Sequence, residues 1–171
     1  RQKAIHDYIV MNVAYDQSFS RYSAYNALAE GKAVCQGYAL LAYKMLKEAG
    51  IENRIVSGTA DGQNHAWNLV KIRGNWYHMD VTWDDPLPDV AGRVTYEYYN
   101  LTDEQMRKDH SWDSSLYPPS RRVKYIYKPS YSGGYQNYKE LPALGGIPVD
   151  KEFTITFSKG VDINSARERI V

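Results

Sequence analysis

The hydrophobic residues in the first 50 positions are spaced as in helices. Ile5 and Ile9 recur four residues apart in a helix-compatible stretch, which predicts a helix over 2–13. A shorter helix is expected over 23–30, because Gly31 follows where a glycine commonly ends a helix. The chain therefore begins with helical elements joined by a polar, tyrosine-rich segment.

The clearest helical pattern covers 35–49, and Gly50 follows as its stop. Its apolar side is formed by Tyr38, Leu41, Ala42, Met45 and Leu46. Because the pattern begins at Cys35, this residue is expected in the first turn of the helix.

After Gly50 the period changes from that of helices to that of strands. The predicted strands are 51–57, 65–72 and 76–83. A polar loop is expected over 58–64, and a tight turn at residues 73–74 makes 65–83 an antiparallel hairpin. Helices combined with an antiparallel sheet predict an α+β fold, in which the Cys35 helix packs on the sheet.

The composition changes near residue 129, where the segments SYSGGY and LPALGGIP are rich in turn-forming residues. We therefore expect a domain over 1–128, a linker-like segment over 129–148 and a strand-forming tail over 149–171. Apolar and polar residues alternate over 153–158, which predicts a strand with one apolar face. This strand either joins the main sheet or opens a further, truncated module.

The charges nearly balance, since 21 Lys and Arg face 20 Asp and Glu in 171 residues. This balance argues against general binding to nucleic acid. No apolar run approaches the length of a membrane-spanning helix. Cys35 is the one cysteine, which excludes an internal disulfide and a cysteine-rich zinc site. The chain begins at Arg1 inside a predicted helix, so we expect it to be a piece of a longer protein.

Cys35 has the position of a reactive thiol. Unpaired cysteines are most often inert, buried side chains. In the first turn of a helix, however, the macrodipole and the unpaired backbone N–H groups stabilise a thiolate and lower the pKa of the thiol. The same N–H groups can hold the negative oxygen that forms when a thiolate attacks a carbonyl.

A thiolate enzyme also needs a base, and the base needs an acceptor that orients it. In the predicted hairpin Trp67 opposes Asp80, which makes His65 and Asp80 diagonal neighbours on one face, about 7–8 Å apart at Cα. His78 shares that face by parity, so periodicity leaves it open as the base. His65 is preferred because it follows the polar loop over 58–64, where the edge of a cleft is expected.

The other two histidines are expected outside the site. His6 falls on the polar side of the first predicted helix and is expected at the surface, and His110 is expected in a loop. A metal site is not expected, since His65 and His78 have neither helical spacing nor a cysteine partner. No cofactor is expected either.

Three motifs occur in order along the chain: GKAVCQGYALLAYKMLKEAGI, in which a Cys opens a helix; HAW, in which a His begins the next strand; and DVTW, in which an Asp ends the following strand. Together they resemble the transglutaminase-like family of papain-type cysteine enzymes, over about residues 1–112. The resemblance implies a papain-like core with Cys35 as nucleophile, His65 as general base and acid, and Asp80 as the residue that orients the imidazole.

The resemblance also implies further residues of the site. Trp67 and Trp83 would wall the cleft, and Tyr15, with Gln36 as its rival, is the candidate for a second donor to the oxyanion. The tail IPVDKEFTITFSKGVD resembles the first strand of Ig-like modules in bacterial surface proteins. That implies an exported, cell-wall-associated chain, and the lack of a long apolar run predicts no membrane span in this part.

The motifs and the resemblance together predict an enzyme that forms a thioester from a peptide or protein amide. Resolution of the thioester by water would make it a peptidase or amidase, and resolution by a lysine amine would make it a cross-linking transglutaminase. The residues are the same for both. The alternative is a catalytically silent surface module that binds peptide or glycan through its 16 tyrosines and 4 tryptophans.

Overall fold

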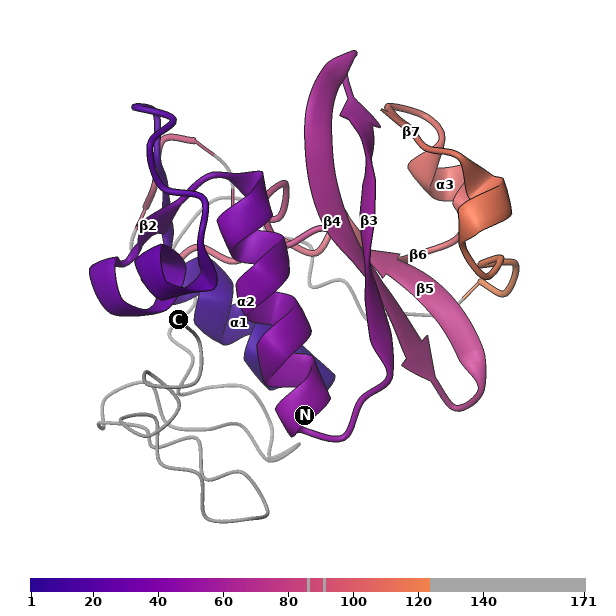
Figure 1. Cartoon of the computed structure of the whole chain (residues 1–171). Helices are drawn as coiled ribbons and strands as arrows, with labels where there is room; N and C mark the ends of the chain where they lie inside the picture. Colours follow the sequence, from indigo (N-terminus) through magenta and orange to yellow (C-terminus); the bar gives the residue numbers. More distant parts are fainter. Residues whose placement is uncertain (86, 91, 124–171) are drawn as a thin grey trace.

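Two helices cover one face of a twisted antiparallel sheet, and a short helix lies over the other face (Figure 1). The computed structural model describes residues 1–123 except 86 and 91. The covering helices are α1 (Gln2–Asn12) and α2 (Cys35–Glu48), and the short one is α3 (Asp103–Met106). The predicted α+β fold, with the Cys35 helix packed on an antiparallel sheet, is confirmed.

The main sheet has the strand order β6-β5-β4-β3-β7, and each neighbouring pair is antiparallel. Its strands are β3 (Asn53–Ala60), β4 (Gln63–Ile72), β5 (Asn75–Met79), β6 (Tyr99–Leu101) and β7 (His110–Ser111). The last of these five strands along the chain, β7, therefore pairs with the first, β3.

A small parallel sheet leads into the Cys35 helix. It joins β1 (Ala14–Tyr15) to β2 (Lys32–Ala33) and pairs Tyr15 with Ala33, two residues before Cys35. A π-helix, η1 (Asn26–Glu30), precedes β2 and ends at Gly31, as expected for the second helix of the chain. A 3-10 turn, η2 (Ser114–Leu116), follows β7.

The main sheet separates two hydrophobic clusters, because its side chains alternate between the two faces. In one cluster Ile9 of α1 and Leu41 of α2 pack with Val70 of β4, and all three are fully buried. The other cluster, under α3, comprises Val56, Trp67, Leu69, Met106 and Trp112. A slip of β4 by one residue would exchange its two sets of side chains, so the two clusters fix the register of the strand that carries His65.

The hairpin of β4 and β5 has the predicted register wherever the two strands pair. The pairing continues without a shift as far as Asn68 and Met79. The strand predicted over 76–83 is shorter than expected. β5 ends at Met79 because the Asp80 carboxylate accepts the N–H groups of the second and third residues after it, which turns the chain away from β4.

The loop predicted over 58–64 is mostly strand. β3 continues to Ala60 and β4 begins at Gln63. Only Asp61 and Gly62 form the turn, and both have positive φ, of 45° and 76°. An Asp-Gly pair is typical of such two-residue hairpin turns, so the sequence carried this feature within the stretch that looked like a loop.

The prediction that His6 lies at the surface is wrong. Its side chain is fully buried, with Nδ1 3.0 Å from Asp7 and Nε2 3.0 Å from Asp84. Burial alone would lower the pKa of His6, but the two carboxylates raise it above its ordinary value. Because both nitrogens have partners, a polar residue is accommodated on the inner side of α1.

The predicted linker over 129–148 and the predicted tail over 149–171 lie outside the described residues, as does the end of the predicted domain. Among the helices of the part that is described, none is long and apolar enough to cross a membrane.

Candidate active site

Cys35 is the first residue of α2, after Val34 as N-cap, and its side chain is partly buried. Its sulfur accepts hydrogen bonds from the backbone N–H groups of Gln36 and Ala66 and is hydrogen-bonded to His65. Burial would raise the pKa of the thiol, but the hydrogen bond and charge of His65, followed by the two N–H groups, lower it below its ordinary value.

His65 lies near the start of β4, between the thiol and a carboxylate. Its Nε2 is 2.6 Å from Oδ2 of Asp80, which leaves Nδ1 as the ring nitrogen for Cys35. Burial alone would lower the pKa of the imidazole, yet the charge and hydrogen bond of Asp80, followed by those of Cys35, raise it to about 10. These shifts favour a thiolate–imidazolium pair at neutral pH.

Asp80 is completely shielded from solvent and accepts four hydrogen bonds. Oδ2 faces the Nε2 atoms of His65 and His110, at 2.6 and 3.1 Å, and Oδ1 accepts from the backbone N–H groups of Thr82 and Trp83. Burial would raise the pKa of the carboxyl, but the charge of His65 and the hydrogen bonds of both histidines lower it to about 2.

Cys35, His65 and Asp80 meet at the place where the pairing of β5 with β4 ends. Strand pairing with β4 stops at Asn68 and Met79, so the first part of β4 continues beyond its neighbour. The first turn of α2 lies against that part of β4, where the Ala66 N–H reaches the Cys35 sulfur. The structure thus joins the three residues that the sequence nominated as a triad.

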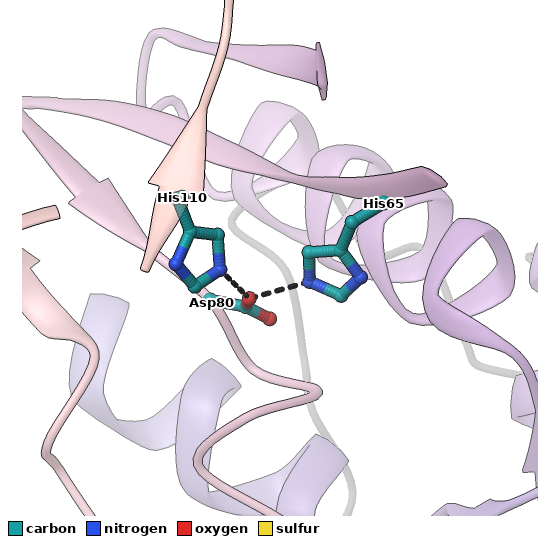
Figure 2. A group of neighbouring side chains, drawn as sticks. All are labelled: His65, Asp80 and His110. Carbon is teal, nitrogen blue, oxygen red and sulfur yellow. Dashed lines mark hydrogen bonds and ion pairs between the residues drawn. The ribbon is translucent and has the colours of Figure 1, made fainter. Parts of the chain in front are cut away.

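A second histidine, His110, meets the same carboxylate and was missed by sequence reasoning. It lies in β7 and not in a loop, and its side chain is buried. Figure 2 shows the rings of His65 and His110 directed at Asp80 from two sides. The pairing of β7 with β3, at Ala60 and His110, brings His110 to Asp80. No local sequence pattern predicts a strand of two residues.

His78, the alternative base, is directed elsewhere. Its Nε2 is 2.9 Å from Asp103, and its Nδ1 accepts from Nε1 of Trp67. Both ring nitrogens are therefore engaged within the cluster under α3. Burial lowers the pKa of His78 below its ordinary value.

The two tryptophans have different places. Trp67 is only 1% exposed and is stacked behind His65 at 5.9 Å between ring centres, so it supports the imidazole and does not wall an open cleft. Trp83 is partly exposed, and its ring lies 6.1 Å from that of His65 and 4.6 Å from that of His110.

The two oxyanion candidates, Tyr15 and Gln36, have different surroundings. Burial and, to a smaller extent, the negative charge of Cys35 raise the pKa of the Tyr15 phenol above its ordinary value. The side chain of Gln36 is exposed, while its backbone N–H donates to Cys35. Tyr15 also lines an open groove of about 400 Å³, together with Ala14, Asp16, Gln17, Ser18, Lys32, Leu87, Pro88 and Asp89.

Among the described residues, the cluster that could hold a metal ion is formed by His65, Asp80 and His110, whose nearest ligand atoms lie within 4.8 Å of one another. Both contacts with Asp80 have hydrogen-bond lengths. Because both nitrogens donate to one ionised oxygen, each Nε2 carries a proton. The geometry is that of a hydrogen-bonded network.

The chain is similar to a known protein family and to two curated proteins. Residues 1–81 match the model of the transglutaminase-like superfamily. The chain is 29% identical over 124 aligned residues to the human and the mouse kyphoscoliosis peptidase, in a match that covers 60% of this chain and 19% of each relative. The chain thus spans about a fifth of the length of these curated relatives.

Two solved structures are also similar. A transglutaminase is 17% identical, with a TM-score of 0.46, over 57% of this chain and 30% of that one. A protein of Cytophaga hutchinsonii, described as a candidate cysteine protease, is 28% identical, with a TM-score of 0.45, over 54% of this chain and 34% of its own.

Proposed function

Because residues 1–81 of this chain match the model of the transglutaminase-like superfamily, we propose that the chain catalyses acyl transfer from peptide or protein amides through a thioester on Cys35. The observation that carries the proposal is the series of contacts from Cys35 to His65 to Asp80. It supplies an ionised nucleophile, a proton donor and acceptor, and a buried group that orients it.

Acylation starts from the thiolate of Cys35 and the imidazolium of His65. The sulfur forms a bond to the amide carbon, and the π electron pair of the carbonyl moves to its oxygen. When this pair returns, the C–N bond breaks and the departing nitrogen takes the proton from His65. An amine leaves, and a thioester and a neutral imidazole remain.

Deacylation follows the same path in reverse with a new acceptor. Water or a primary amine attacks the thioester carbon and gives its proton to His65, and the C–S bond breaks to restore the thiolate. Water yields a carboxylic acid, and a lysine amine yields a new amide. Asp80 holds the Nε2 proton throughout, so Nδ1 is the nitrogen that exchanges protons.

The negative oxygen needs donors that face it before the reaction begins. The first turn of a helix presents backbone N–H groups without intrahelical partners, and Cys35 lies in that turn of α2. Tyr15 is proposed as the side-chain donor, because its phenol keeps its proton and the charge of Cys35 acts on it. Tyr15 also lines the groove, which is open to solvent.

Trapping of the thioester tests the proposal for either acceptor. Hydroxylamine converts an acyl thioester into a hydroxamate, which mass spectrometry detects in a casein digest incubated with the chain. We expect hydroxamates with the unaltered chain and none with Cys35→Ala. Omitting hydroxylamine and adding a dansylated primary amine then separates amide formation from hydrolysis. Equal amounts of hydroxamate from the unaltered chain and from Cys35→Ala would refute the proposal.

A further inference from the structure

Two histidines share one oxygen of a buried carboxylate. His65 approaches Oδ2 of Asp80 to 2.6 Å, and His110 approaches the same atom to 3.1 Å (Figure 2). Oδ1 accepts hydrogen bonds from two backbone N–H groups. The proposed chemistry uses the first of these contacts only. The side chains of His110 and Asp80 are both fully shielded from solvent.

The second ring nitrogen of His110, Nδ1, also has a carboxylate partner. This nitrogen lies 2.5 Å from Oδ1 of Asp109, and Oδ2 of Asp109 accepts the hydroxyl proton of Tyr98 at 2.7 Å. The titratable groups therefore form one series, from Cys35 through His65, Asp80 and His110 to Asp109 and Tyr98. Other titratable groups near this series are Asp84, which the charge of Asp80 reaches, and His78, which the charge of His110 reaches.

The main chain is arranged to bring His110 this close. β7 approaches β3 at Gly58, where a Cβ atom would lie 2.1 Å from the carbonyl oxygen of Ser111 and 2.9 Å from the ring of Trp67. Only glycine leaves room for both. A second feature is the ring of Trp83, which covers His110 edge to face at 4.6 Å.

An oxygen that accepts two N–H donors attracts each of them less strongly than an oxygen that accepts one. The proton on Nε2 of His65 is therefore held less tightly than Asp80 alone would hold it. This matters for the thioester reaction, because an imidazolium that is stabilised too strongly gives up its other proton, on Nδ1, slowly to the leaving amine.

We propose that His110 is a positioning residue of this site: by donating from Nε2 to the Asp80 oxygen that also holds His65, it fixes that carboxylate and sets how readily His65 releases a proton. The inference rests on the proposed function. It concerns a residue that acts through Asp80 and touches neither the substrate nor Cys35.

The pH dependence of iodoacetamide alkylation tests this role, because Cys35 is the one cysteine and every alkylated thiol reports on it. In the unaltered chain the alkylation rate is expected to rise with pH where the ion pair forms, which gives the acidic limb of the profile. The rate is expected to change again at higher pH where His65 loses its proton, which gives the basic limb. In His110→Phe, which keeps a ring and loses the donor, we expect the basic limb to move up by about one pH unit. In His110→Gln, whose amide N–H can reach Asp80, we expect it to stay within about 0.3 units.

Two outcomes would overturn the proposal. One is a basic limb in His110→Phe that coincides with that of the unaltered chain, and the other is an equal shift in both variants, which would reflect packing alone. His78→Phe is the matched control, since it removes a buried histidine bonded to another carboxylate, Asp103, and we expect it to leave the limb in place. A chain that shows no ion pair before substitution would instead contradict the proposed function.

If His110→Phe does not fold, proton NMR of the unaltered chain decides. The Nε2 protons of His65 and His110 are expected as two strongly downfield signals, because both hydrogen-bond to one carboxylate oxygen. The His110 signal is expected to move when His65 titrates at the basic limb. A His110 signal that does not respond would refute the coupling through Asp80.

Discussion

Nε2 of His65 lies 2.6 Å from Oδ2 of Asp80, and the two side chains are 7% and 0% exposed. The pair is therefore hardly screened by solvent, and replacing the carboxylate leaves a buried imidazole without its orienting partner. We expect Asp80→Asn to lower the rate of thioester formation by about 10²- to 10⁴-fold. Hydroxamate formation at about pH 7 measures this loss. A variant within a factor of two of the unaltered chain would contradict the role of Asp80.

The same pair predicts how stability depends on pH. The pKa of His65 is raised from 6.5 to about 10. The stabilisation of the folded state by its imidazolium is therefore complete below pH 6.5 and is lost as the pH rises through 10. The pKa of Asp80 is lowered from 3.8 to about 2, so its contribution is complete above 3.8 and is lost as the pH falls through 2.

Urea unfolding of the unaltered chain and of His65→Ala checks this window. We expect the difference in the free energy of unfolding to be largest between about pH 4 and pH 6.5, on the order of 3 kcal/mol, and to shrink toward pH 10. A difference that grows from pH 6.5 to pH 10 would contradict the assigned direction of the His65 shift.

Tyr15→Phe removes a hydroxyl donor and keeps the aromatic ring. If the Tyr15 hydroxyl stabilises the oxyanion, the turnover rate falls by about 10- to 100-fold, because the donor acts mainly when negative charge develops. The alkylation profile of Cys35 should stay unchanged, since alkylation forms no oxyanion. Gln36→Ala, at the rival position, is expected to retain turnover. A larger loss of turnover in Gln36→Ala than in Tyr15→Phe would assign the role of oxyanion donor to Gln36.

Gly58→Ala tests the close contact between β3 and β7. The added methyl carbon would lie 2.1 Å from the carbonyl oxygen of Ser111, so β7 must move away and carry His110 with it. We expect a loss of stability of about 1–3 kcal/mol by thermal unfolding. Ser57→Ala, at an exposed neighbouring position, should change stability by less than about 0.5 kcal/mol. Equal stability of Gly58→Ala and Ser57→Ala would show that β7 can move away from β3 without a loss of stability.

Asp85 contributes a second pH dependence, of opposite sign to that of Asp80. The hydroxyl of Tyr38 has one proton and two oxygen neighbours, the carbonyl of Val13 at 2.8 Å and Oδ2 of Asp85 at 2.6 Å. Burial raises the pKa of Asp85 from 3.8 to about 6. A neutral carboxyl can donate to Tyr38, which then donates to Val13, so the folded state loses stability as the pH rises from 3.8 through 6.

Asp85→Asn removes this loss because an amide is neutral at every pH and can donate to Tyr38. We expect the free energy of unfolding to increase by about 1–3 kcal/mol at pH 8 and to change little at pH 4. Asp61→Asn, at an exposed turn, is the matched control and should change stability by less than about 0.5 kcal/mol. A less stable Asp85→Asn at pH 8 would contradict the assignment.

Much of the site follows from short-range patterns. The hairpin that positions His65 and Asp80 is set by alternation and by a two-residue turn, and the register derived from them holds as far as Met79. The helix that begins at Cys35 follows from one apolar stripe and a terminal glycine. Such features depend on residues a few positions apart, which periodicity describes well.

The histidines that the sequence misplaced have partners far along the chain. His110 contacts Asp80 from 30 positions away, and His6 contacts Asp84 from 78 positions away. A buried histidine bonded to a distant carboxylate has the same local pattern as an exposed one, so burial was visible only once the fold was known. The strand and surface module expected over 149–171 stay a prediction, since those residues lie outside the described part.

If Cys35 is an ionised nucleophile paired with His65, the pH dependence of its alkylation by iodoacetamide must show it. We expect the apparent pKa of Cys35 in the unaltered chain to lie below that of a free thiol, because His65 and two backbone N–H groups stabilise the thiolate, and to shift upward in His65→Ala. An apparent pKa near that of a free thiol, about 8.5, in both proteins would contradict it.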